Sequence, residues 1–503
     1  MPIADDLNEA QQQAVTYSGG HLLIVAGPGT GKTHTLIRRI AHTVPSLQSG
    51  AKILAITFTN KAAGQMKSRL AALGFSEEKV FIGTFHAFCL NLLRQYWAHT
   101  ALPKDFKIAS AEEVQGLGFG KAGLEKISRM KSTQLAIQPD EEYKSYQRAL
   151  RQRGWMDFDD ILREALTLLE EEAIAGEIRS LYGRIFVDEY QDINIIQNAL
   201  LRELAGENGI VTAIGDPHQS IYGFRGSEVK LFNRFAQDFP DAKTLYLNVN
   251  YRSSANLLAA SSQVITGNCH SRESGNPDTP QKFELIAKIY GEGKLVIHQA
   301  ATDRAEADYV AAQIEKMVGG MHMMSARGAQ RSFGDIAVLY RLNAQRHAIA
   351  QALDHLGIPY QVSAKPPKPA AYSDDAALGQ YEEILDYSVE KVSLLTVHAA
   401  KGLEFPVVFM VGCEDKLLPL NTAGMQSDPQ EERRLFYVGM TRAKECLHLS
   451  YANRRQLFGQ TIFHGPSPFL SDIEEKLKAY ETARRREKVK KIEAADASQL
   501  KLF

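Results

Sequence analysis

The sequence is poor in the features that several classes of protein require. Its four cysteines, Cys89, Cys269, Cys413 and Cys446, are far apart and form no C-x-x-C pair, which argues against zinc, iron–sulfur and disulfide sites. No apolar run is long enough to span a bilayer, and the N-terminus has acids where a signal peptide needs bases. We therefore expect a cytoplasmic protein that has no membrane partner.

An excess of positive charge is also missing. The 58 Lys and Arg residues balance 59 Asp and Glu residues, which gives a net charge of -1. Any binding of nucleic acid must therefore depend on local groups rather than on net charge. A length of 503 residues, with 44% hydrophobic and 23% charged residues, allows two to four globular domains.

Short apolar runs alternate with segments of helical periodicity, which predicts an α/β fold with parallel sheets. One set of runs comprises HLLIVA, KILAITFT, RIFVDE and IVTAIGD, and a second comprises KTLYLNV, KLVIHQAA, DIAVLYR, VSLLTVHA, PVVFMVG and CLHLSY. We assign the sets to lobes at 1–245 and 246–473, with a polar helical insertion in the first lobe at about 88–180. The mixed-charge tail at 474–503 is predicted to be a solvated helix and linker, and 267–281 a surface loop without an assigned function.

The segment AGPGTGKT carries the phosphate-loop signature, with Ala26 where the usual pattern begins with Gly. In this signature the glycines turn backbone N–H groups toward phosphate, the lysine charge lies on the β and γ groups, and the threonine hydroxyl holds Mg²⁺. The corresponding residues are Gly29, Thr30, Gly31, Lys32 and Thr33. An apolar run precedes the loop, and a helical stripe follows it at Ile37, Ile40, Ala41 and Val44. The sequence therefore predicts that ATP and Mg²⁺ bind here.

A second acidic element completes a hydrolytic site. RIFVDEYQD places Asp188 and Glu189 after a buried strand, where Asp188 would hold Mg²⁺ and Glu189 would accept the proton of the attacking water. An acidic pair after an apolar run is by itself more often the solvated end of a strand. The phosphate loop earlier in the chain favours the catalytic interpretation.

Nine sequence blocks, in a fixed order, resemble the UvrD, Rep and PcrA group of superfamily 1 helicases. The blocks run from Leu7 to Ala443 and are LNEAQQQAV, AGPGTGKT, TFTNKAA, GTFHAF, VDEYQD, IGDPHQSIYGFRGS, NYRSS, TVHAAKGLEF and EERRLFYVGMTRA. The resemblance implies two RecA-like motor lobes. It also implies an ATP-driven helicase or translocase that moves 3′ to 5′ on single-stranded DNA, in DNA repair or replication.

The resemblance also implies roles at the nucleotide. Gln11 would read the adenine edge, Tyr251 would stack on the base and Glu404 would accept from the ribose. The resemblance implies three catalytic residues in addition to Lys32 and Glu189. Gln219 would sense the γ-phosphate. Arg252 and Arg442 would be the arginine fingers that the second lobe contributes. A surface salt bridge with the nearby EERR segment is an equally good interpretation of Arg442 on residue type alone.

Residues beside the ATPase blocks match the family's DNA-contacting positions. They are Phe58, Asn60, Lys61, Thr84, His86, Tyr222, Phe224, Arg225 and His398. Aromatic faces stack on bases without reading their sequence, so this composition suits single-stranded DNA. Before the resemblance is counted, core packing is the better interpretation of Phe58 and Tyr222. Phe224 replaces a common Trp, which reduces the stacking area, and DPHQS departs from the more acidic DDDQS.

One segment of the family pattern is missing. The helicases that this chain resembles carry a large helical domain between the strand equivalent to IPYQV and the TVHAAKGLEF block. Here a proline-containing bridge of 28 residues, 364–391, joins the two, and no independent core fits in that length. Duplex binding and autoinhibition are the functions that this loss affects.

Three other functions remain open. A translocase that strips proteins from single strands but unwinds poorly is an alternative within the motor class. A nucleotide-switched adaptor, which binds ATP and a partner, is an alternative of another class. An RNA motor is disfavoured because the blocks are not those of the RNA-acting families.

The chain ends on QLKLF, after a charged and alanine-rich segment. This ending resembles the short peptide that docks on the bacterial sliding clamp, with Gln499, Leu500, Leu502 and Phe503 as its contact residues. The alternative is that these apolar side chains fold back onto the motor's own core. Their position at a free terminus favours docking on a clamp.

Overall fold

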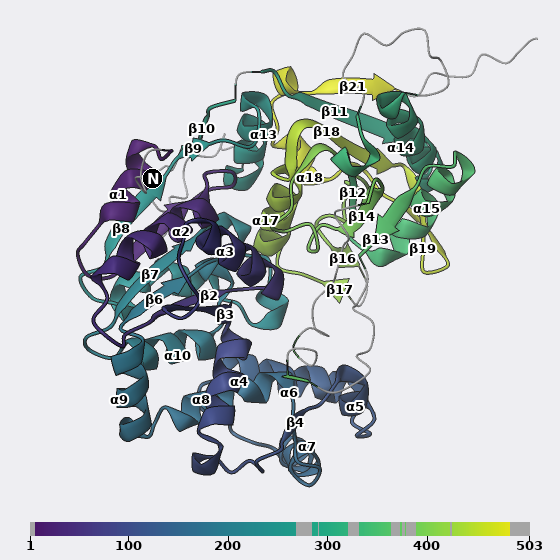
Figure 1. Cartoon of the computed structure of the whole chain (residues 1–503). Helices are drawn as coiled ribbons and strands as arrows, with labels where there is room; N and C mark the ends of the chain where they lie inside the picture. Colours follow the sequence, from purple (N-terminus) through teal and green to yellow (C-terminus); the bar gives the residue numbers. More distant parts are fainter. Residues whose placement is uncertain are drawn as a thin grey trace, which may run out of the picture.

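The chain forms two lobes, and a helical insertion extends from one end of the first lobe (Figure 1). The computed structural model describes residues 6–267, 284–289, 291–319, 331–363, 373–374, 378, 389–422 and 425–482. Most of the 267–281 loop and of the bridge, and all of the QLKLF ending, lie outside the described residues. Within the described residues, no helix is both long and apolar enough to cross a membrane.

The first lobe is built on a sheet of six parallel strands. In spatial order they are β3 (Val80–Thr84), β2 (Ile53–Thr57), β6 (Arg184–Val187), β7 (Ile210–Gly215), β1 (Leu22–Ala26) and β8 (Lys243–Leu247). Leu22 and Ile24 belong to one apolar cluster, whereas Leu23 and Val25 belong to another. Because successive strand residues point to opposite faces, both faces of this sheet are buried, as the continuous apolar runs predict.

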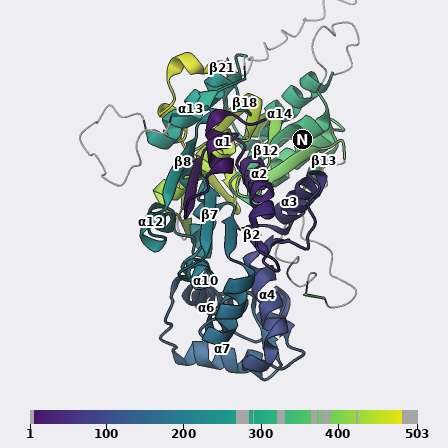
Figure 2. The ribbon, with the colours of Figure 1, turned by 60° about the vertical axis from the view of Figure 1, so that its left-hand side comes forward.

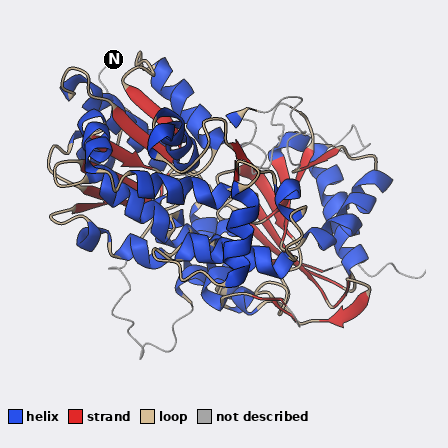
Figure 3. Cartoon of the chain, turned by 90° about the horizontal axis from the view of Figure 1, so that it is seen from below, coloured by secondary structure: helices blue, strands red, loops and turns tan. Residues whose placement is uncertain are grey.

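Helices cover both faces of the first sheet (Figure 3). The first apolar cluster includes residues of α1 (Glu9–Thr16), α2 (Lys32–Thr43) and α3 (Asn60–Ala72). The second includes residues of the insertion, of α10 (Ile195–Ala205) and of the short helices α11 (Val229–Asn233) and α12 (Phe235–Asp238). The sheet is therefore the middle layer of a three-layer lobe.

The predicted insertion is helical and lies between β3 and β6. Its helices are α4 (Phe85–Gln95), α5 (Ala111–Gln115), α6 (Lys121–Thr133), α7 (Glu141–Arg151), α8 (Phe158–Leu168) and α9 (Glu172–Leu181). A two-stranded sheet, β4 (Lys107–Ile108) with β5 (Trp155–Met156), joins two of its loops. Figures 1 and 2 both show the insertion below the first sheet.

The second lobe contains a sheet of seven parallel strands. In spatial order they are β13 (Tyr360–Val362), β14 (Val392–Thr396), β12 (Ile336–Tyr340), β15 (Phe405–Met410), β18 (Ala443–Ala452), β11 (Lys294–Ala300) and β21 (Ala479–Thr482). Its helices are α13 (Ala255–Thr266), α14 (Asp303–Val318), α15 (Arg346–His355), α17 (Pro429–Met440) and α18 (Pro468–Ser471). Short pairs complete the lobe: β9 (Val249–Asn250) with β10 (Ile286–Ala287), β16 (Asn421–Thr422) with β17 (Met425–Gln426), and β19 (Arg454–Leu457) with β20 (Gln460–Phe463).

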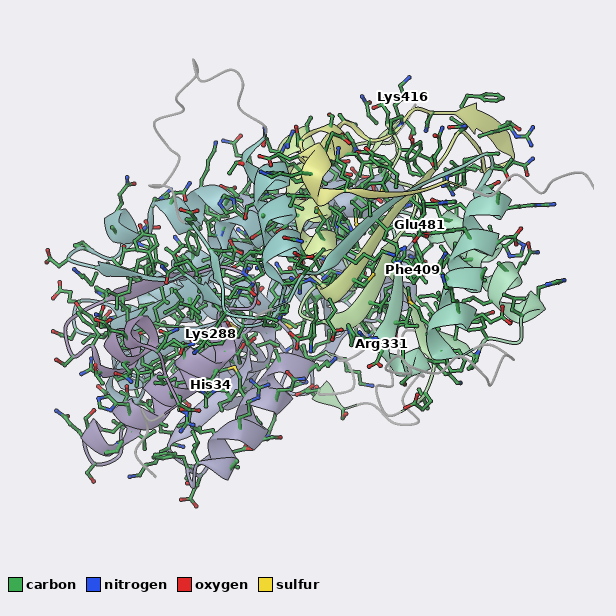
Figure 4. All side chains as sticks on the ribbon, turned by 90° about the horizontal axis from the view of Figure 1, so that it is seen from above. His34, Lys288, Arg331, Phe409, Lys416 and Glu481 are labelled. Atoms are coloured by element: carbon green, nitrogen blue, oxygen red, sulfur yellow. The ribbon has the colours of Figure 1, made fainter. Side chains whose placement is uncertain are left out.

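Two of our sequence predictions are wrong at the edges of these sheets. KTLYL was assigned to the second lobe, but it forms β8 and pairs with β1 of the first sheet. The start of the tail was assigned to a solvated helix and linker, but 479–482 forms the edge strand β21. Glu481, labelled in Figure 4, explains the second error: Lys294 and Tyr309 contact its carboxylate at 3.1 and 2.9 Å. These partners are distant in sequence, so local charge alone could not reveal the strand.

Candidate nucleotide site and strand-binding surface

The phosphate loop lies between β1 and α2, and its backbone conformation requires glycine. Gly29 and Gly31 have φ angles of +68° and +80°, a region that residues with a side chain rarely adopt. A Cβ on Gly29 would stand 2.6 Å from the Cβ of Arg252, so the loop packs directly against the segment that leads into the second lobe. The Lys32 ammonium, in the first turn of α2, lies 3.3 Å from the carbonyl oxygen of Ala26. The predicted apolar stripe is buried along α2 and at the residue that follows it: Ile37, Ile40, Ala41 and Val44.

Asp188 and Glu189 follow β6 at the carboxyl end of the first sheet. Thr33 Oγ1 lies 3.4 Å from Asp188 Oδ2. Burial and the neighbouring charge of Glu189 raise the pKa of Asp188 to about 7. Burial opposes the ionisation of Glu189 as well, but the charges of Lys32 and Lys401 outweigh it and hold the pKa of Glu189 below its ordinary value. A hydroxyl and a carboxylate are the oxygen ligands that Mg²⁺ prefers, so Thr33 and Asp188 fit this ion.

A buried hydrogen-bond network holds Glu189 and was not found from the sequence. Glu189 has a φ angle of +52°, which is uncommon for a residue with a side chain and stores strain at a functional position. The Gln191 side chain donates to the Glu189 carboxylate and accepts from the backbone N–H of Asp216 at 3.0 Å. Asp216 in turn accepts from Gln219 Nε2 at 2.7 Å. Glu189, the expected base, is therefore connected to Gln219, the expected γ-phosphate sensor, through Gln191 and Asp216.

A cleft of about 800 Å³ opens beside the phosphate loop, a volume within the range of small-molecule sites. Six of the predicted residues line it: Gln11, Gly29, Gly31, Tyr251, Arg252 and Glu404. Asn8 joins the two side chains expected to recognise the base, because its Nδ2 donates to Tyr251 Oη at 2.8 Å and its backbone N–H donates to Gln11 Oε1 at 2.9 Å. Gln11 Nε2 donates to the carbonyl of Thr30 at 3.0 Å. Asn8 is thus a further residue of the base-binding end.

The two predicted arginine fingers have different partners. Arg442 is 1% exposed, and its guanidinium donates to Gln219 Oε1 at 3.4 Å, from the second lobe to the first. Burial and the charge of Arg252 lower the pKa of Arg442 to about 9. Arg252 itself donates to Glu404 at 2.6 Å, and Lys444 contacts the same carboxylate at 2.7 Å. A nucleotide that binds in the cleft would therefore have to break these ion pairs of Glu404 and replace them with contacts to its own groups.

A lysine that sequence reasoning missed joins the two lobes. The Lys401 ammonium pairs with Asp192 and donates to the carbonyl of Gln219 at 2.6 Å. It also stands 4.9 Å from the ring centre of Tyr222. Burial raises the pKa of Asp192 to about 7 although the Lys401 charge acts against this rise. Lys401 lies in the TVHAAKGLEF block, so its presence was visible, but its partner on the other lobe was not.

Five of the predicted DNA-contacting residues form a row. Phe58 and Tyr222 are stacked, with ring centres 4.8 Å apart and an interplanar angle of 17°. Phe224 meets Tyr222 and His398 edge-on, at 6.0 and 5.6 Å, and Arg225 lies over Phe224 at 5.7 Å. Phe224 is 62% exposed, whereas Phe58 and Tyr222 are half-buried. The row offers exposed aromatic edges and faces beside a cation, which is what a single strand needs for stacking.

The other four predicted contacts lie at the starts of two helices. Asn60 and Lys61 begin α3, and burial lowers the pKa of Lys61. Thr84 Oγ1 caps α4 by accepting a backbone N–H. His86 stacks on Phe158 at 3.7 Å, and burial lowers its pKa to about 3, so the imidazole is neutral. Among the described residues, His86 Nε2 is buried without a hydrogen-bond partner.

The loop between β7 and α11 belongs to the first lobe in sequence but packs into the second. Ile221 is fully buried, and its side chain is part of the apolar cluster of the second lobe. Arg434 Nε donates to the carbonyl of Ser220 at 2.7 Å, and the N–H of Gly223 donates to Glu431 Oε1 at 2.9 Å. The loop that carries the central aromatic residues is therefore held by the second lobe.

These contacts also decide the alternative interpretation of Arg442. Within EERR, Glu431 and Arg434 hold the loop, while Glu432 pairs with Arg341 at 2.8 Å. Arg433 lies 2.5 Å from Asp472. Together with the burial of Arg442, these partners exclude a surface salt bridge.

Two family descriptions match nearly all of the described chain. Residues 7–135 and 120–240 match the UvrD/REP helicase N-terminal domain. Residues 245–366 and 373–454 match the UvrD-like helicase C-terminal domain. The break in the second match falls inside the bridge at 364–391.

Several bacterial helicases are similar to the chain over most of its length. The ATP-dependent DNA helicase UvrD1 of Mycobacterium tuberculosis is 28% identical over 94% of this chain and 86% of the relative. The ATP-dependent DNA helicase PcrA of Staphylococcus epidermidis is 27% identical over 97% and 89%. DNA helicase II of Escherichia coli is 28% identical over 94% and 88%. The last alignment spans 660 positions, 157 more than the 503 residues of this chain, so the relative has long segments without a counterpart here.

Proposed function

The chain belongs to the UvrD/Rep helicase family, and we propose that it moves 3′ to 5′ along single-stranded DNA and unwinds 3′-tailed duplexes. It is an ATP-hydrolysing DNA helicase by family membership. We place its work in DNA repair or replication, in the cytoplasm. The bridge at 364–391 stands where the family resemblance implies a large helical domain, so we expect duplex binding and autoinhibition to be the functions that differ most in this chain.

A continuous path of contacts between the ATPase residues and the aromatic row carries the proposal. Lys401 binds Asp192 and the Gln219 carbonyl at one end and stands over Tyr222 at the other. Arg442 reaches Gln219 from the second lobe. Loss of the γ-phosphate would alter the position of Gln219 and therefore its contact with Lys401. Because Lys401 also contacts Tyr222 of the aromatic row, hydrolysis can be coupled to movement along the strand.

The ATPase residues divide the work of hydrolysis. Thr33 and Asp188 would hold Mg²⁺, which supplies positive charge at the β and γ phosphates when it is bound. Lys32 adds a fixed charge at the same groups. Glu189 accepts the proton of the attacking water, because its pKa below the ordinary value keeps it ionised. Arg442 supplies a planar cation from the other lobe when the cleft closes.

Steady-state ATPase with and without single-stranded DNA tests the motor. We expect strong stimulation by DNA in the wild type and none in Lys32→Ala. Lys67→Ala is a matched control, because Lys67 is a half-exposed lysine of the same lobe that pairs with Glu77 on the surface. Equal rates with and without DNA in the wild type would favour the nucleotide-switched adaptor instead.

Strand displacement separates the helicase from the protein-stripping translocase. We expect ATP-dependent unwinding of a duplex with a 3′ tail and much less with a 5′ tail. Release of streptavidin from a biotinylated single strand measures translocation by itself. Release of streptavidin without strand displacement would support the translocase, and a preference for 5′ tails would contradict the proposed direction.

We further propose that Gln499, Leu500, Leu502 and Phe503 dock on a sliding clamp. A peptide of this size binds with about micromolar affinity, so its benefit is tethering to a clamp already on DNA. Deletion of 499–503 should abolish clamp binding and leave the melting temperature and ATPase unchanged. A lower melting temperature, with no clamp binding by the intact chain, would show instead that the ending belongs to the fold.

A further inference from the structure

The side chain of Asn250, at the end of β9, joins the phosphate loop to the segment that carries Arg252. Asn250 is fully buried, and its Nδ2 donates to the carbonyl of Pro28 at 2.6 Å. Its Oδ1 accepts the backbone N–H groups of Arg252 and Ser253 at 2.9 and 2.8 Å. An amide carries a donor nitrogen and an acceptor oxygen as separate atoms, so one Asn side chain can hold both sets of partners at once.

The contact with Pro28 is one of two that fix the peptide planes of the phosphate loop. The backbone N–H of Tyr251 donates to the carbonyl of Gly29 at 2.8 Å. In a planar trans peptide the C=O and the N–H point in opposite directions. Because the carbonyls of Pro28 and Gly29 face β9 and Tyr251, the N–H groups of Gly29 and Thr30 are turned away from that segment. Asn250 therefore helps to aim the N–H groups that the sequence assigns to phosphate.

The two accepted N–H groups fix a turn that leads to both predicted arginine fingers. An Asn side chain that accepts from the backbone two and three residues ahead holds the chain in one local conformation. The side chain of Arg252 leaves this turn. Ser253 Oγ donates to the carbonyl of Ala443, the residue after Arg442, at 2.8 Å. The turn is thus held between the two fingers, and Asn250 connects it to the phosphate loop.

We propose that Asn250 is a positioning residue for ATP hydrolysis, which fixes the phosphate loop and Arg252 relative to one another. It is not one of the residues that line the nucleotide cleft, so it acts through its partners and does not touch the nucleotide. A misplacement of about 1 Å can lower the rate of a catalysed reaction about a hundredfold. Loss of Asn250 should therefore slow hydrolysis more than it weakens the binding of ATP. The inference rests on the proposed function in one respect, because it takes Arg252 as an arginine finger.

The first test separates turnover from binding in two variants. Asn250→Ala removes all of these side-chain hydrogen bonds, whereas Asn250→Asp keeps the acceptor of the turn and turns an oxygen toward the carbonyl of Pro28. We expect kcat in saturating single-stranded DNA to fall by about 10- to 100-fold in Asn250→Ala and by at least about threefold in Asn250→Asp. The Kd of a fluorescent ATP analogue should stay within about threefold of the wild type in both. A wild-type kcat in folded Asn250→Asp, or a loss confined to binding, would overturn the proposal.

The matched control is Gln345→Ala, which removes a buried amide of the second lobe. Gln345 is 3% exposed, and its Oε1 accepts the backbone N–H groups of Arg341 and Leu342 at 3.0 and 2.8 Å. Its loss should lower the melting temperature, as that of Asn250 does, but leave kcat in saturating DNA within about twofold of the wild type. If Asn250→Ala lowers the melting temperature but has the kcat of Gln345→Ala, Asn250 only supports the fold and the proposal is wrong.

A double-mutant cycle tests whether Asn250 acts through Arg252. The rate of single-turnover ATP hydrolysis is measured without DNA in the wild type, Asn250→Ala, Arg252→Ala and the double variant. Once Arg252 is absent, loss of Asn250 should change the rate by less than about twofold. Asn250→Asp provides the same comparison if the alanine variant does not fold. An equal loss in both backgrounds would contradict the proposal.

These measurements also distinguish failure of the proposed function from failure of this inference. If the chain is not driven by DNA, the wild type will show neither stimulation of ATPase by DNA nor strand displacement, while the coupling between Asn250 and Arg252 is still measured in hydrolysis without DNA. If the inference alone is wrong, the wild type will be stimulated by DNA, and the effects of the two substitutions will simply add.

Discussion

Replacing Lys401 with methionine should weaken the closed arrangement of the lobes in a way that depends on pH. The change removes the cation that pairs with Asp192 and bonds to the Gln219 carbonyl, while it keeps a similar volume. Asp192 is then buried without a counter-charge, and one of its carboxylate oxygens already lacks a hydrogen-bond partner among the described residues. Removing one member of a buried ion pair costs about 3–5 kcal/mol when the other must stay charged.

Protonation of Asp192 limits this cost at low pH. The pKa of Asp192 is about 7 with Lys401 present, well above its ordinary 3.8, and it should rise further without the lysine. A carboxyl whose pKa is raised in the closed form binds a proton there, so closing becomes less favourable as the pH rises from the ordinary value through the raised one. At pH 6, below the pKa of Asp192, the closed arrangement of the variant loses only the hydrogen bonds that the Lys401 ammonium donates, which contribute about 1.5–3 kcal/mol. Because Asp192 of the wild type titrates near 7 as well, the additional loss of the variant develops above pH 7, where each pH unit adds up to about 1.4 kcal/mol, a factor of ten, until the higher pKa of the variant is passed.

The assay is kcat/KM for ATP in saturating single-stranded DNA, measured at pH 6, 7 and 8 for the wild type and Lys401→Met. We expect the deficit of the variant to change little between pH 6 and 7 and to grow by up to about tenfold between pH 7 and 8. Adding Asp192→Asn to Lys401→Met should abolish this dependence, since no carboxyl remains to titrate. A deficit that is the same at every pH, or a double variant as pH-dependent as the single one, would refute the reasoning.

Three further predictions concern other residues of the site. Glu189→Gln should bind ATP with nearly wild-type affinity but turn over about a hundredfold or more slowly, as equilibrium binding and steady-state rates would show. Arg442→Ala should lower turnover to a similar degree, and a wild-type rate would contradict its assignment as a finger. Ile221→Ala should lower the free energy of unfolding by about 2–5 kcal/mol in denaturant titration and reduce stimulation of ATPase by DNA, and an unaffected stimulation would argue against a mechanical role for its loop.

The parts of the site that could be predicted are those with local sequence signatures. Gly29, Gly31 and Lys32 follow from a loop whose spacing is imposed by phosphate, and Asp188 and Glu189 from their place after a buried strand. The cleft lined by Gln11, Tyr251 and Glu404 agrees with the roles that the family resemblance implies for them. The roles themselves, like those of the aromatic row, remain predictions.

What could not be predicted depends on partners far apart in the chain. Asn8 joins Tyr251 across 243 residues, and Lys401 meets Asp192 across 209. Neither contact leaves a periodic or local pattern. The edge strands were misassigned for a related reason: β8 is a half-exposed strand next to a lobe boundary, and β21 is held by the partners of Glu481 rather than by apolar residues of its own.

The burial of Ile221 in the second lobe has a consequence for protein engineering. A chimera of two related motors that exchanges lobes at the covalent junction near Leu247 would place Ile221 of one parent in a cavity shaped by the other. A fragment ending at that junction would expose the same side chain to water and invite aggregation. Exchange that carries Ser220 to Arg225 with the second lobe keeps both apolar cores complete. The unit that can be exchanged between motors is therefore the second lobe together with Ser220 to Arg225. These two segments are separate in the gene but contiguous in space.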